Sequence, residues 1–225
     1  MWHRGIFVGV IMVHIKTIRK KLSNDVWKSS FQIKGWDSLF SALCAMIRVD
    51  NSTGVWNMRI ETERLTITQF TMDMAQAVHL NSLDEDNRRF VPDEVFETVQ
   101  EAADTVSFLM GVYENGGGPL VYPVLLKDGT YIGYVQAVPF YDGTWEVGYH
   151  IGAAYTKKGY ATEAVRAFLP VIMLRLGLKR IKGICLADNL ASRKVMERCG
   201  FIREYEGPGP YQGNERRICR FSYSL

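Results

Sequence analysis

The chain has 225 residues, of which 47% are hydrophobic and 23% are charged, a composition typical of a folded domain with an apolar core. The formal net charge is +3, but residues 1–57 carry eight Lys and Arg against three Asp and Glu, whereas residues 58–225 carry nineteen against twenty-one. Because the excess basic charge lies in the first segment, charge alone excludes a basic nucleic-acid-binding surface on the rest of the chain.

Residues 1–57 differ from the rest of the chain in pattern as well as in charge. Residues 5–13 form an apolar run that is too short to span a membrane, and no small-x-small cleavage site follows it. Residues 58–65, by contrast, resemble the beginning of a domain. We therefore expect residues 1–57 to be an N-terminal extension, either poorly ordered or upstream of a natural start at Met58. Residues 58–225 are expected to form the functional domain.

The cysteines show no CxxC or otherwise paired spacing, which favours reduced, buried thiols in a cytoplasmic protein and argues against a cysteine metal site. They are Cys44, Cys185, Cys199 and Cys219. His79 and His150 are interpreted as polar-face residues rather than as ligands, so no metal site is predicted.

The first half of the domain predicts two helices and a hairpin. Residues 65–69 are typical of a strand, and Thr71 is a candidate N-cap for a helix that continues to about residue 80. Thr98-x-x-Glu101 forms a capping box that opens a second helix, with Ala102, Val106, Leu109, Met110 and Tyr113 on its buried face. Residues 120–126 and 131–138 flank Asp128-Gly129, a dipeptide that tolerates the positive φ angles of a hairpin turn.

The second half predicts strand–helix–strand units. Residues 145–151 alternate with period two, and apolar residues at helical spacing follow from Gly159 to Gly177. A strand at 180–186 and a helix from Asn189 to Arg198 come next. The last part is predicted as a strand from Phe201, a long loop over residues 207–214 and a final strand over residues 219–225. The elements together indicate a single α/β (α+β) domain with a mixed, mainly antiparallel central sheet, flanking helices and one parallel crossover.

The turn between residues 145–151 and the following helix is the most informative local feature. A strand that enters a helix through a Gly turn leaves several backbone N–H groups unpaired, and the helix dipole favours negative charge at the same place. Lys157 and Lys158 add positive charge beside Gly159. The sequence therefore predicts an anion-binding site, although Gly159 could merely permit the turn and the two lysines could be a solvated pair.

Four motifs in this order resemble the GNAT superfamily of acetyl-CoA-dependent N-acetyltransferases. They are Glu61 to Leu65 (ETERL), Trp145 to Tyr149 (WEVGY), Lys158 to Ala164 (KGYATEA) and Asn189 to Phe201 (NLASRKVMERCGF). The resemblance is closest to the branch that includes the ribosomal-protein N-terminal acetyltransferases. It covers residues 58–225 and implies the GNAT fold, in which one parallel pair of strands splays apart, together with acetyl-CoA as the acyl donor.

The resemblance also implies a set of cofactor-binding residues. The family's pyrophosphate loop, Arg/Gln-x-x-Gly-x-Gly/Ala, falls on Thr156, Lys157, Lys158, Gly159, Tyr160 and Ala161, with Thr156 in place of the usual Arg or Gln. The pantetheine arm would bond the backbone of Ile151, Gly152 and Ala153, and Asn189 would hydrogen-bond the cofactor. Ser192 lies where the departing thiolate could receive a proton. Many relatives use a Tyr as this acid near the position of Met196, which is closed here unless Tyr205 or another tyrosine replaces it.

The chemistry of acyl transfer points to one further residue. A thioester reacts only with a neutral amine, and the tetrahedral oxyanion and leaving thiolate both need stabilisation. Glu146 is our candidate base, acting directly or through water, because it precedes the cofactor-binding end of its strand. Covalent catalysis is disfavoured because Cys185 and Cys199 sit among apolar residues. Purely structural roles remain open for these residues: Asn189 could be a plain helix cap, Ser192 an ordinary first-turn residue and Glu146 a structural carboxylate.

Three functions are therefore compared. The preferred one is an N-acetyltransferase that moves an acetyl group to a primary amine of a small molecule or protein N-terminus by direct transfer in a ternary complex. The alternatives are a non-catalytic acyl-CoA sensor and a peptide- or ribosome-associated binding module. An acidic region, Asp84, Glu85, Asp86, Asp93, Glu94 and Glu97, would favour a cationic acceptor, or it could be a solvated surface. No nucleic-acid or membrane partner is expected, and the oligomeric state is left between monomer and homodimer.

Overall fold

A computed structural model describes residues 58–115, 118–140 and 142–225. The expectations for residues 1–57, including Cys44, lie outside the described residues. The helices and strands are β1 (Ile60–Glu61), β2 (Leu65–Ile67), α3 (Ala75–Ser82), α4 (Glu85–Phe90), α5 (Val99–Asn115), β3 (Leu120–Leu126), β4 (Tyr131–Pro139), β5 (Trp145–Ile151), α6 (Tyr160–Leu176), β6 (Arg180–Leu186), α7 (Leu190–Arg198), β7 (Ile202–Tyr211) and β8 (Asn214–Ser224). Short 3-10 turns cover Met72–Met74, Pro92–Glu94 and Ala153–Tyr155.

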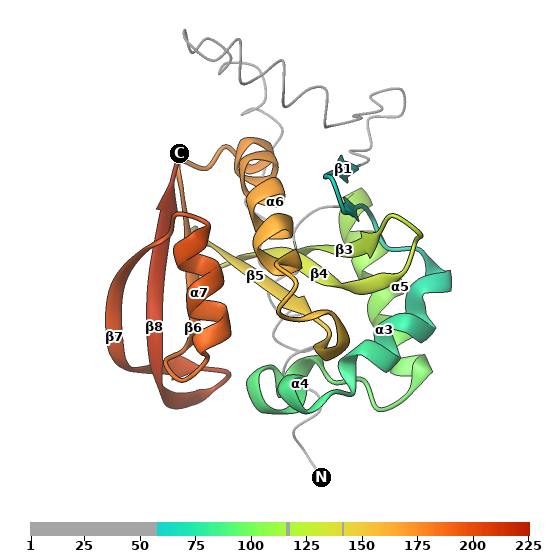
Figure 1. The fold of residues 1–225 in the computed structure, drawn as a ribbon, viewed down its shortest axis with the longest axis horizontal. Coiled ribbons are helices and arrows are strands. Elements are labelled where there is room, and N and C mark those ends of the chain that lie inside the picture. Colours follow the sequence, from blue (N-terminus) through green and yellow to red (C-terminus); the bar gives the residue numbers. More distant parts are fainter. Residues whose placement is uncertain (1–57, 116–117, 141) are drawn as a thin grey trace, which may run out of the picture.

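The strands form one eight-stranded sheet in the order β1-β2-β3-β4-β5-β6-β8-β7. Every neighbouring pair is antiparallel except β5 and β6, which are parallel and share a single register pair, Glu146 with Lys182. Beyond that pair the two strands diverge, so the sheet divides into a β1–β5 half and a β6–β8 half (Figure 1). The mixed, mainly antiparallel α/β architecture with a splayed parallel pair predicted from the sequence is confirmed.

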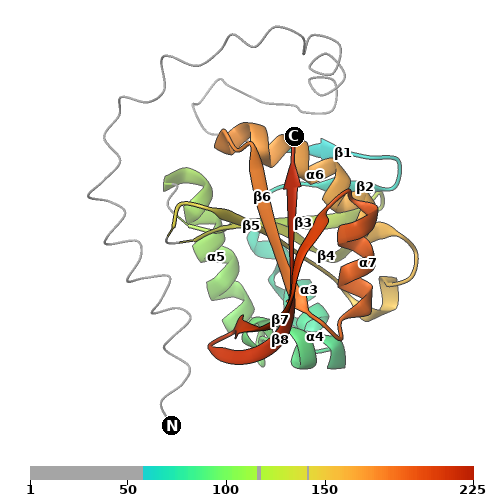
Figure 2. The same cartoon turned by 90° about the vertical axis from the view of Figure 1, so that its left-hand side faces the viewer.

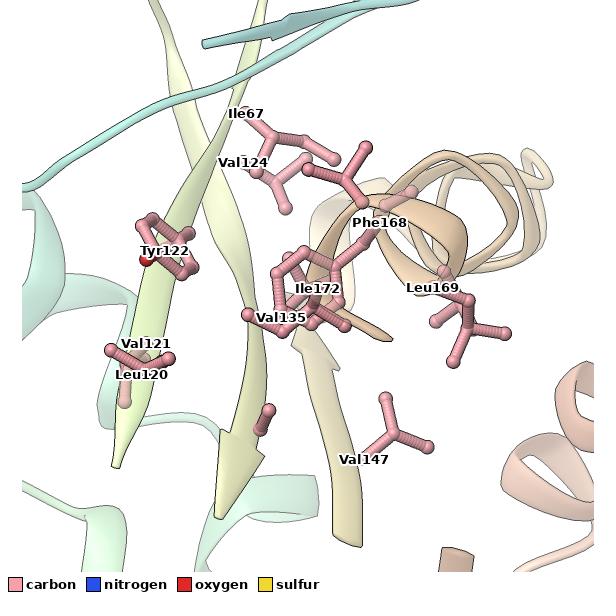
Figure 3. Packing of buried hydrophobic residues seen from close by; sticks show 14 of the residues in the cluster. Ile67, Leu120, Val121, Tyr122, Val124, Val135, Val147, Phe168, Leu169 and Ile172 are labelled. Atoms are coloured by element: carbon pink, nitrogen blue, oxygen red, sulfur yellow. The ribbon is translucent and has the colours of Figure 1, made fainter. Parts of the chain in front are cut away.

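Helices cover both faces of the sheet. The helices α6 and α7 lie on one face, and α3, α4 and α5 lie on the other (Figures 1 and 2). The main core lies beneath α6, where Phe168 and Ile172 pack against Val124 and Val135 (Figure 3). Val147 of β5 points to this same face, so alternation along the strand directs its even-numbered side chains toward α3, α4 and α5.

The predicted long loop over residues 207–214 is wrong. These residues belong to a long hairpin in which β7 pairs with β8 from Ile202 to Tyr211, and the turn occupies Gln212 and Gly213, both with positive φ. Pro208 and Pro210 misled the prediction because proline removes a backbone donor. The strand β7 tolerates them because it is the outermost strand of the sheet and needs hydrogen bonds on one side only.

Smaller corrections concern the first helices. The first strand is shorter than predicted, Leu65–Ile67, and Thr71 makes no side-chain cap hydrogen bond, since a 3-10 turn precedes α3. Thr98 Oγ1 accepts from the Glu101 N–H at 3.2 Å, as the capping box predicts, and the Glu101 carboxylate accepts from the Glu97 N–H at 2.8 Å. Val112 joins the buried face of α5, where Met110 is partly buried against the core, and the short helix α4 had not been predicted. Among the described helices, none combines the length and apolar character that crossing a membrane requires.

Candidate active site

The turn between β5 and α6 has the geometry of an anion-binding loop. Lys157 and Gly159 have φ angles of 62° and 84°, so the chain reverses sharply around Lys158 before the helix begins. Gly159 occupies the N-cap position and no side chain caps the helix. The first N–H groups of α6 therefore lack intrahelical partners and point out of the helix end, where the dipole favours an anion. An exposed backbone with this geometry fits a diphosphate.

Arg64, which the sequence analysis had not assigned to the site, contacts this loop although it lies far from it in the sequence. Its guanidinium donates to the Lys158 carbonyl at 3.0 Å and lies over the Tyr160 ring at 4.7 Å. A side chain on Gly159 would have its Cβ 3.5 Å from the guanidinium. Family members have Arg or Gln at the position that Thr156 occupies here. In this chain an arginine from another position, Arg64, lies beside the loop.

Glu163 in the first turn of α6 explains how Arg64 is held. Its carboxylate accepts from Arg64 Nε at 2.7 Å and from the Thr62 hydroxyl at 2.6 Å. Burial alone would raise the pKa of Glu163, but these hydrogen bonds and the Arg64 charge lower it below its usual value. The negative charge of Glu163 is thus paired with Arg64, which reduces its repulsion of an anion at the helix end.

The exposed side chains of Thr156 and Lys158 hydrogen-bond the turn itself. The Thr156 hydroxyl donates to the Ala153 carbonyl at 2.9 Å, and Lys158 Nζ donates to the Ala154 carbonyl at 3.3 Å. The same ammonium lies 5.6 Å from the centre of the Tyr155 ring. Both side chains therefore stabilise the turn itself, and the backbone amides of the loop are left as the main anion donors.

The segment predicted to bond the pantetheine arm is partly engaged within the protein. The N–H of Gly152 donates to the Ile132 carbonyl at 2.9 Å, and the N–H of Ala153 donates to Asp84 Oδ2 at 3.1 Å. Asp84 also caps α4 through the Asn87 N–H at 2.7 Å. The segment lies where β5 has already parted from β6, so its outer edge has no neighbouring strand.

The residues predicted for the thiol end of the cofactor meet at the start of α7. Asn189 Oδ1 caps the helix by accepting from the Ser192 N–H at 3.0 Å. The Tyr149 hydroxyl, from β5, lies 2.9 Å from both the Ser192 carbonyl oxygen and Ser192 Oγ. Burial raises the pKa of Tyr149, so its phenol keeps its proton. Tyr205, by contrast, donates to the Pro208 carbonyl at 2.8 Å within its own hairpin.

Glu146 lies at the point where the parallel strands separate. It forms the register pair with Lys182 and is partly buried on the face that α3, α4 and α5 cover. Burial raises the pKa of its carboxyl to about 8, opposed by a hydrogen bond with the Ile184 backbone and by the charge of Lys182. A carboxyl group with this pKa exchanges its proton near neutral pH, which suits a general base.

The cysteines near the site are poor nucleophiles. Cys185, Cys199 and Cys219 are buried and free. Burial raises the pKa of the Cys185 thiol to about 12 and that of the Cys199 thiol to about 11. Thiols with these pKa values are almost fully protonated at neutral pH, which agrees with the expectation that the reaction forms no acyl-cysteine.

Comparisons with known proteins agree with this geometry. A family model described as an acetyltransferase (GNAT) domain matches residues 64–202, more than half of the chain. The chain is 32% identical to the uncharacterized N-acetyltransferase YnaD of Bacillus subtilis over 149 residues, which are 65% of this chain and 84% of that protein.

Solved structures share the fold. A GNAT-family acetyltransferase from Bacillus anthracis superposes with a TM-score of 0.63 at 29% identity, covering 74% of this chain and 98% of that one. A RimL ribosomal L7/L12 α-N-protein acetyltransferase in complex with coenzyme A gives a TM-score of 0.63 at 16% identity, over 73% of this chain and 96% of that one. The chain therefore belongs to the GNAT family and is an acetyltransferase whose acetyl donor is acetyl-CoA.

Proposed function

We propose that this protein transfers the acetyl group to a primary amine, on a small molecule or a protein N-terminus, by direct attack in a ternary complex. The observation that supports this most strongly is the position of Glu146. Its carboxyl group lies at the one register pair that still joins β5 to β6, with a pKa raised to about 8. When bound, acetyl-CoA supplies an acetyl group that its thioester has already activated.

Binding of the cofactor is assigned to the loop and the strand edge described above. The exposed amides from Thr156 to Ala161 hold the diphosphate, and Arg64 keeps that loop in place. The edge of Ile151, Gly152 and Ala153 accommodates the pantetheine arm, with Asn189 at its far end. Because the Ala153 N–H is held by Asp84, binding through that amide requires the Asp84 carboxylate to release it.

Proton removal is assigned to Glu146. The acceptor must lose a proton to react, and amines with pKa values near 8 to 10 are mostly protonated at neutral pH. Glu146 accepts this proton directly or through water. The Ile184 backbone and Lys182 favour its ionised form, while burial keeps it basic enough to act.

Proton donation is assigned to the hydroxyl pair on the opposite side of the strand. Tyr149 and Ser192 hold exchangeable protons 2.9 Å apart at the start of α7, where we expect the leaving thiolate to receive one. The sequence analysis had assigned this role to Ser192 alone. We propose Tyr149 for the role of the tyrosine that other family members carry near the position of Met196, a residue that is fully buried here.

The direct test is release of free coenzyme A thiol from acetyl-CoA on adding a panel of primary amines. A mass-spectrometric screen with deuterated acetyl-CoA then identifies the acetylated acceptor. We expect amine-dependent thiol release in the wild type and its loss in Glu146→Gln. Tight coenzyme A binding without amine-dependent release would favour the acyl-CoA sensor instead.

The proposal also covers the domain division and the location of the protein. Residues 58–225 are proposed as the catalytic unit and residues 1–57 as an extension that catalysis does not need. The cysteines in the described part of the chain, Cys185, Cys199 and Cys219, are free and buried, which supports a cytoplasmic location. Activity and melting temperature of the chain lacking residues 1–57, compared with the full chain, test the first point, since loss of folding would contradict it.

A further inference from the structure

A polar stripe crosses the sheet face beneath α4. Gln136 of β4 lies opposite Gly148 of β5, and Glu146 and His150 flank that glycine on the same face. Polar groups on a sheet face covered by helices cost free energy unless they are paired. This stripe surrounds the proposed base, Glu146, with polar side chains on the covered face of the sheet.

Gly148 is what lets the Gln136 side chain cross the strand. A Cβ on Gly148 would lie 2.6 Å from Gln136 Nε2 and 2.9 Å from its Cγ. The side chain instead occupies this space and hydrogen-bonds Glu94, which the 3-10 turn Pro92–Glu94 carries over the sheet. The glycine and the glutamine therefore hold Glu94 against the face that also carries Glu146.

Glu94 is only half satisfied. Its Oε2 is buried without a hydrogen-bond partner in the described part of the protein, as are Asn87 Oδ1 of α4 and His150 Nε2 of β5. Burial raises the pKa of Glu94 to about 7, opposed by the hydrogen bond with Gln136. Buried polar groups without a partner are rare in folded proteins, and a functional role is one explanation for them.

Tyr211 lies near both glutamates. It reaches from the end of β7, and its hydroxyl donates to the Phe90 carbonyl at 3.2 Å. Burial, together with the charges of Glu146 and Glu94, raises the pKa of Tyr211 to about 12. Gln136, which hydrogen-bonds Glu94, lies opposite Gly148, and Glu146 is the next residue on the same face of that strand, so the two glutamates border one polar patch beside the parallel strand pair.

Cations in the surrounding segments already have carboxylate partners. Arg88 pairs with Glu97 at 2.7 Å and Arg89 pairs with Asp188 at 2.7 Å. Lys182 Nζ lies 3.4 Å from Asp142 Oδ2 and 3.1 Å from Thr144 Oγ1. A ligand with a positive charge would complement the two glutamates, whereas a carboxylate beside its amine would face them directly.

Building on the proposed function, we propose that Glu94 selects the acceptor. With Glu146 it binds a primary amine that carries no negative charge next to the amino group, as in an amino amide, a simple amine or a peptide N-terminus. Free α-amino acids, whose carboxylate is attached to the carbon that bears the amine, are rejected by the same two glutamates.

The experiment compares alaninamide with alanine on the full chain, with rates expressed per concentration of free-base amine. At pH 9, where both carboxyl groups are largely ionised, we expect kcat/KM to favour alaninamide by about 30-fold or more in the wild type, because like charges in direct apposition are strongly disfavoured. In Glu94→Gln the preference should fall to within about threefold, mainly through a roughly tenfold higher KM for alaninamide. Glu215→Gln, the same change on an exposed carboxylate at the start of β8, should behave as the wild type.

A second readout does not depend on turnover. On the protein saturated with coenzyme A, alaninamide should raise the melting temperature and alanine should not, and Glu94→Gln should lose this difference. A tripeptide amide that begins with Ala presents the same uncharged neighbour to the amine in a peptide. Acetylation of either amide, or a higher melting temperature with either one, supports the inference. Glu94→Gln itself should melt no lower than the wild type, since it removes a half-satisfied buried carboxyl group.

Equal use of alanine and alaninamide by the wild type would overturn the inference, as would an unchanged preference in Glu94→Gln. A lower melting temperature of Glu94→Gln together with an unchanged preference would show Glu94 to be structural. If coenzyme A binds but no amine is acetylated, the proposed function fails, and the melting comparison still decides whether the glutamates select a cationic amine.

Discussion

Replacing Glu146 by Gln should abolish the pH dependence that the base confers. With a pKa of about 8, the carboxyl group of Glu146 is ionised to about a tenth at pH 7, about half at pH 8 and about nine-tenths at pH 9. Since the ionised form is the active one, turnover of the wild type should rise about tenfold from pH 7 to its plateau. Glu146→Gln should show no such rise and a turnover lower by about 100-fold or more.

Initial rates of thiol release between pH 6 and 9.5, at saturating acetyl-CoA and amine, measure this profile. Two acceptors whose amines differ in pKa separate the enzyme's ionisation from the substrate's, because the inflection near pH 8 should stay in place for both. The affinity for coenzyme A should change by less than about twofold, since Glu146 lies away from the diphosphate loop. Glu215→Gln, on the exposed start of β8, is the control.

A Glu146→Gln variant that keeps the wild-type profile would remove Glu146 from the role of base. A profile whose inflection follows the acceptor's own pKa would lead to the same conclusion, because the titrating group would then be the amine.

Four further changes test the remaining parts of the account. Arg64→Ala should weaken coenzyme A binding by about tenfold, because it frees the loop and leaves Glu163 unpaired beside the phosphates; calorimetry should show partial recovery in Arg64→Ala with Glu163→Gln. Tyr149→Phe should lower kcat by about tenfold with little change in KM, measured by thiol release. Gly159→Ala should destabilise the fold by about 1 kcal/mol, seen in urea unfolding, and weaken coenzyme A binding, because its φ is 84°. Phe168→Ala should cost about 3–5 kcal/mol in the same assay with an unchanged m-value, since Phe168 is fully buried beneath α6.

Elements with strong local patterns could be predicted from the sequence to the residue. Residues 120–126, 145–151 and 180–186 were predicted as strands and have these bounds in the structure, because alternation and turn residues define them locally. The β7–β8 hairpin was missed because its prolines indicate a loop unless the strand is known to lie at the edge of the sheet. Whether a strand lies at the edge depends on the whole sheet, so a short stretch of sequence does not reveal it.

The candidate site divides in the same way. The anion loop around Gly159 was predicted because one continuous segment builds it. Arg64 and Glu163 are 99 residues apart in the chain, and their pairing depends on how β2 packs beside α6. Tyr149 was not assigned to the site, and Glu94 was predicted only as one member of an acidic region, for a related reason. Their partners, Ser192 and Gln136, lie on other elements. That the Gln136 side chain fills the space beside Gly148 is apparent only from the three-dimensional structure.

Calorimetric titration of the full chain with coenzyme A tests the central claim most directly, namely that the amides between Thr156 and Ala161 hold the diphosphate. The account predicts a saturable, one-to-one heat of binding that weakens in Arg64→Ala and in Gly159→Ala. Well-folded wild-type protein that shows neither heat nor saturation with coenzyme A would contradict it.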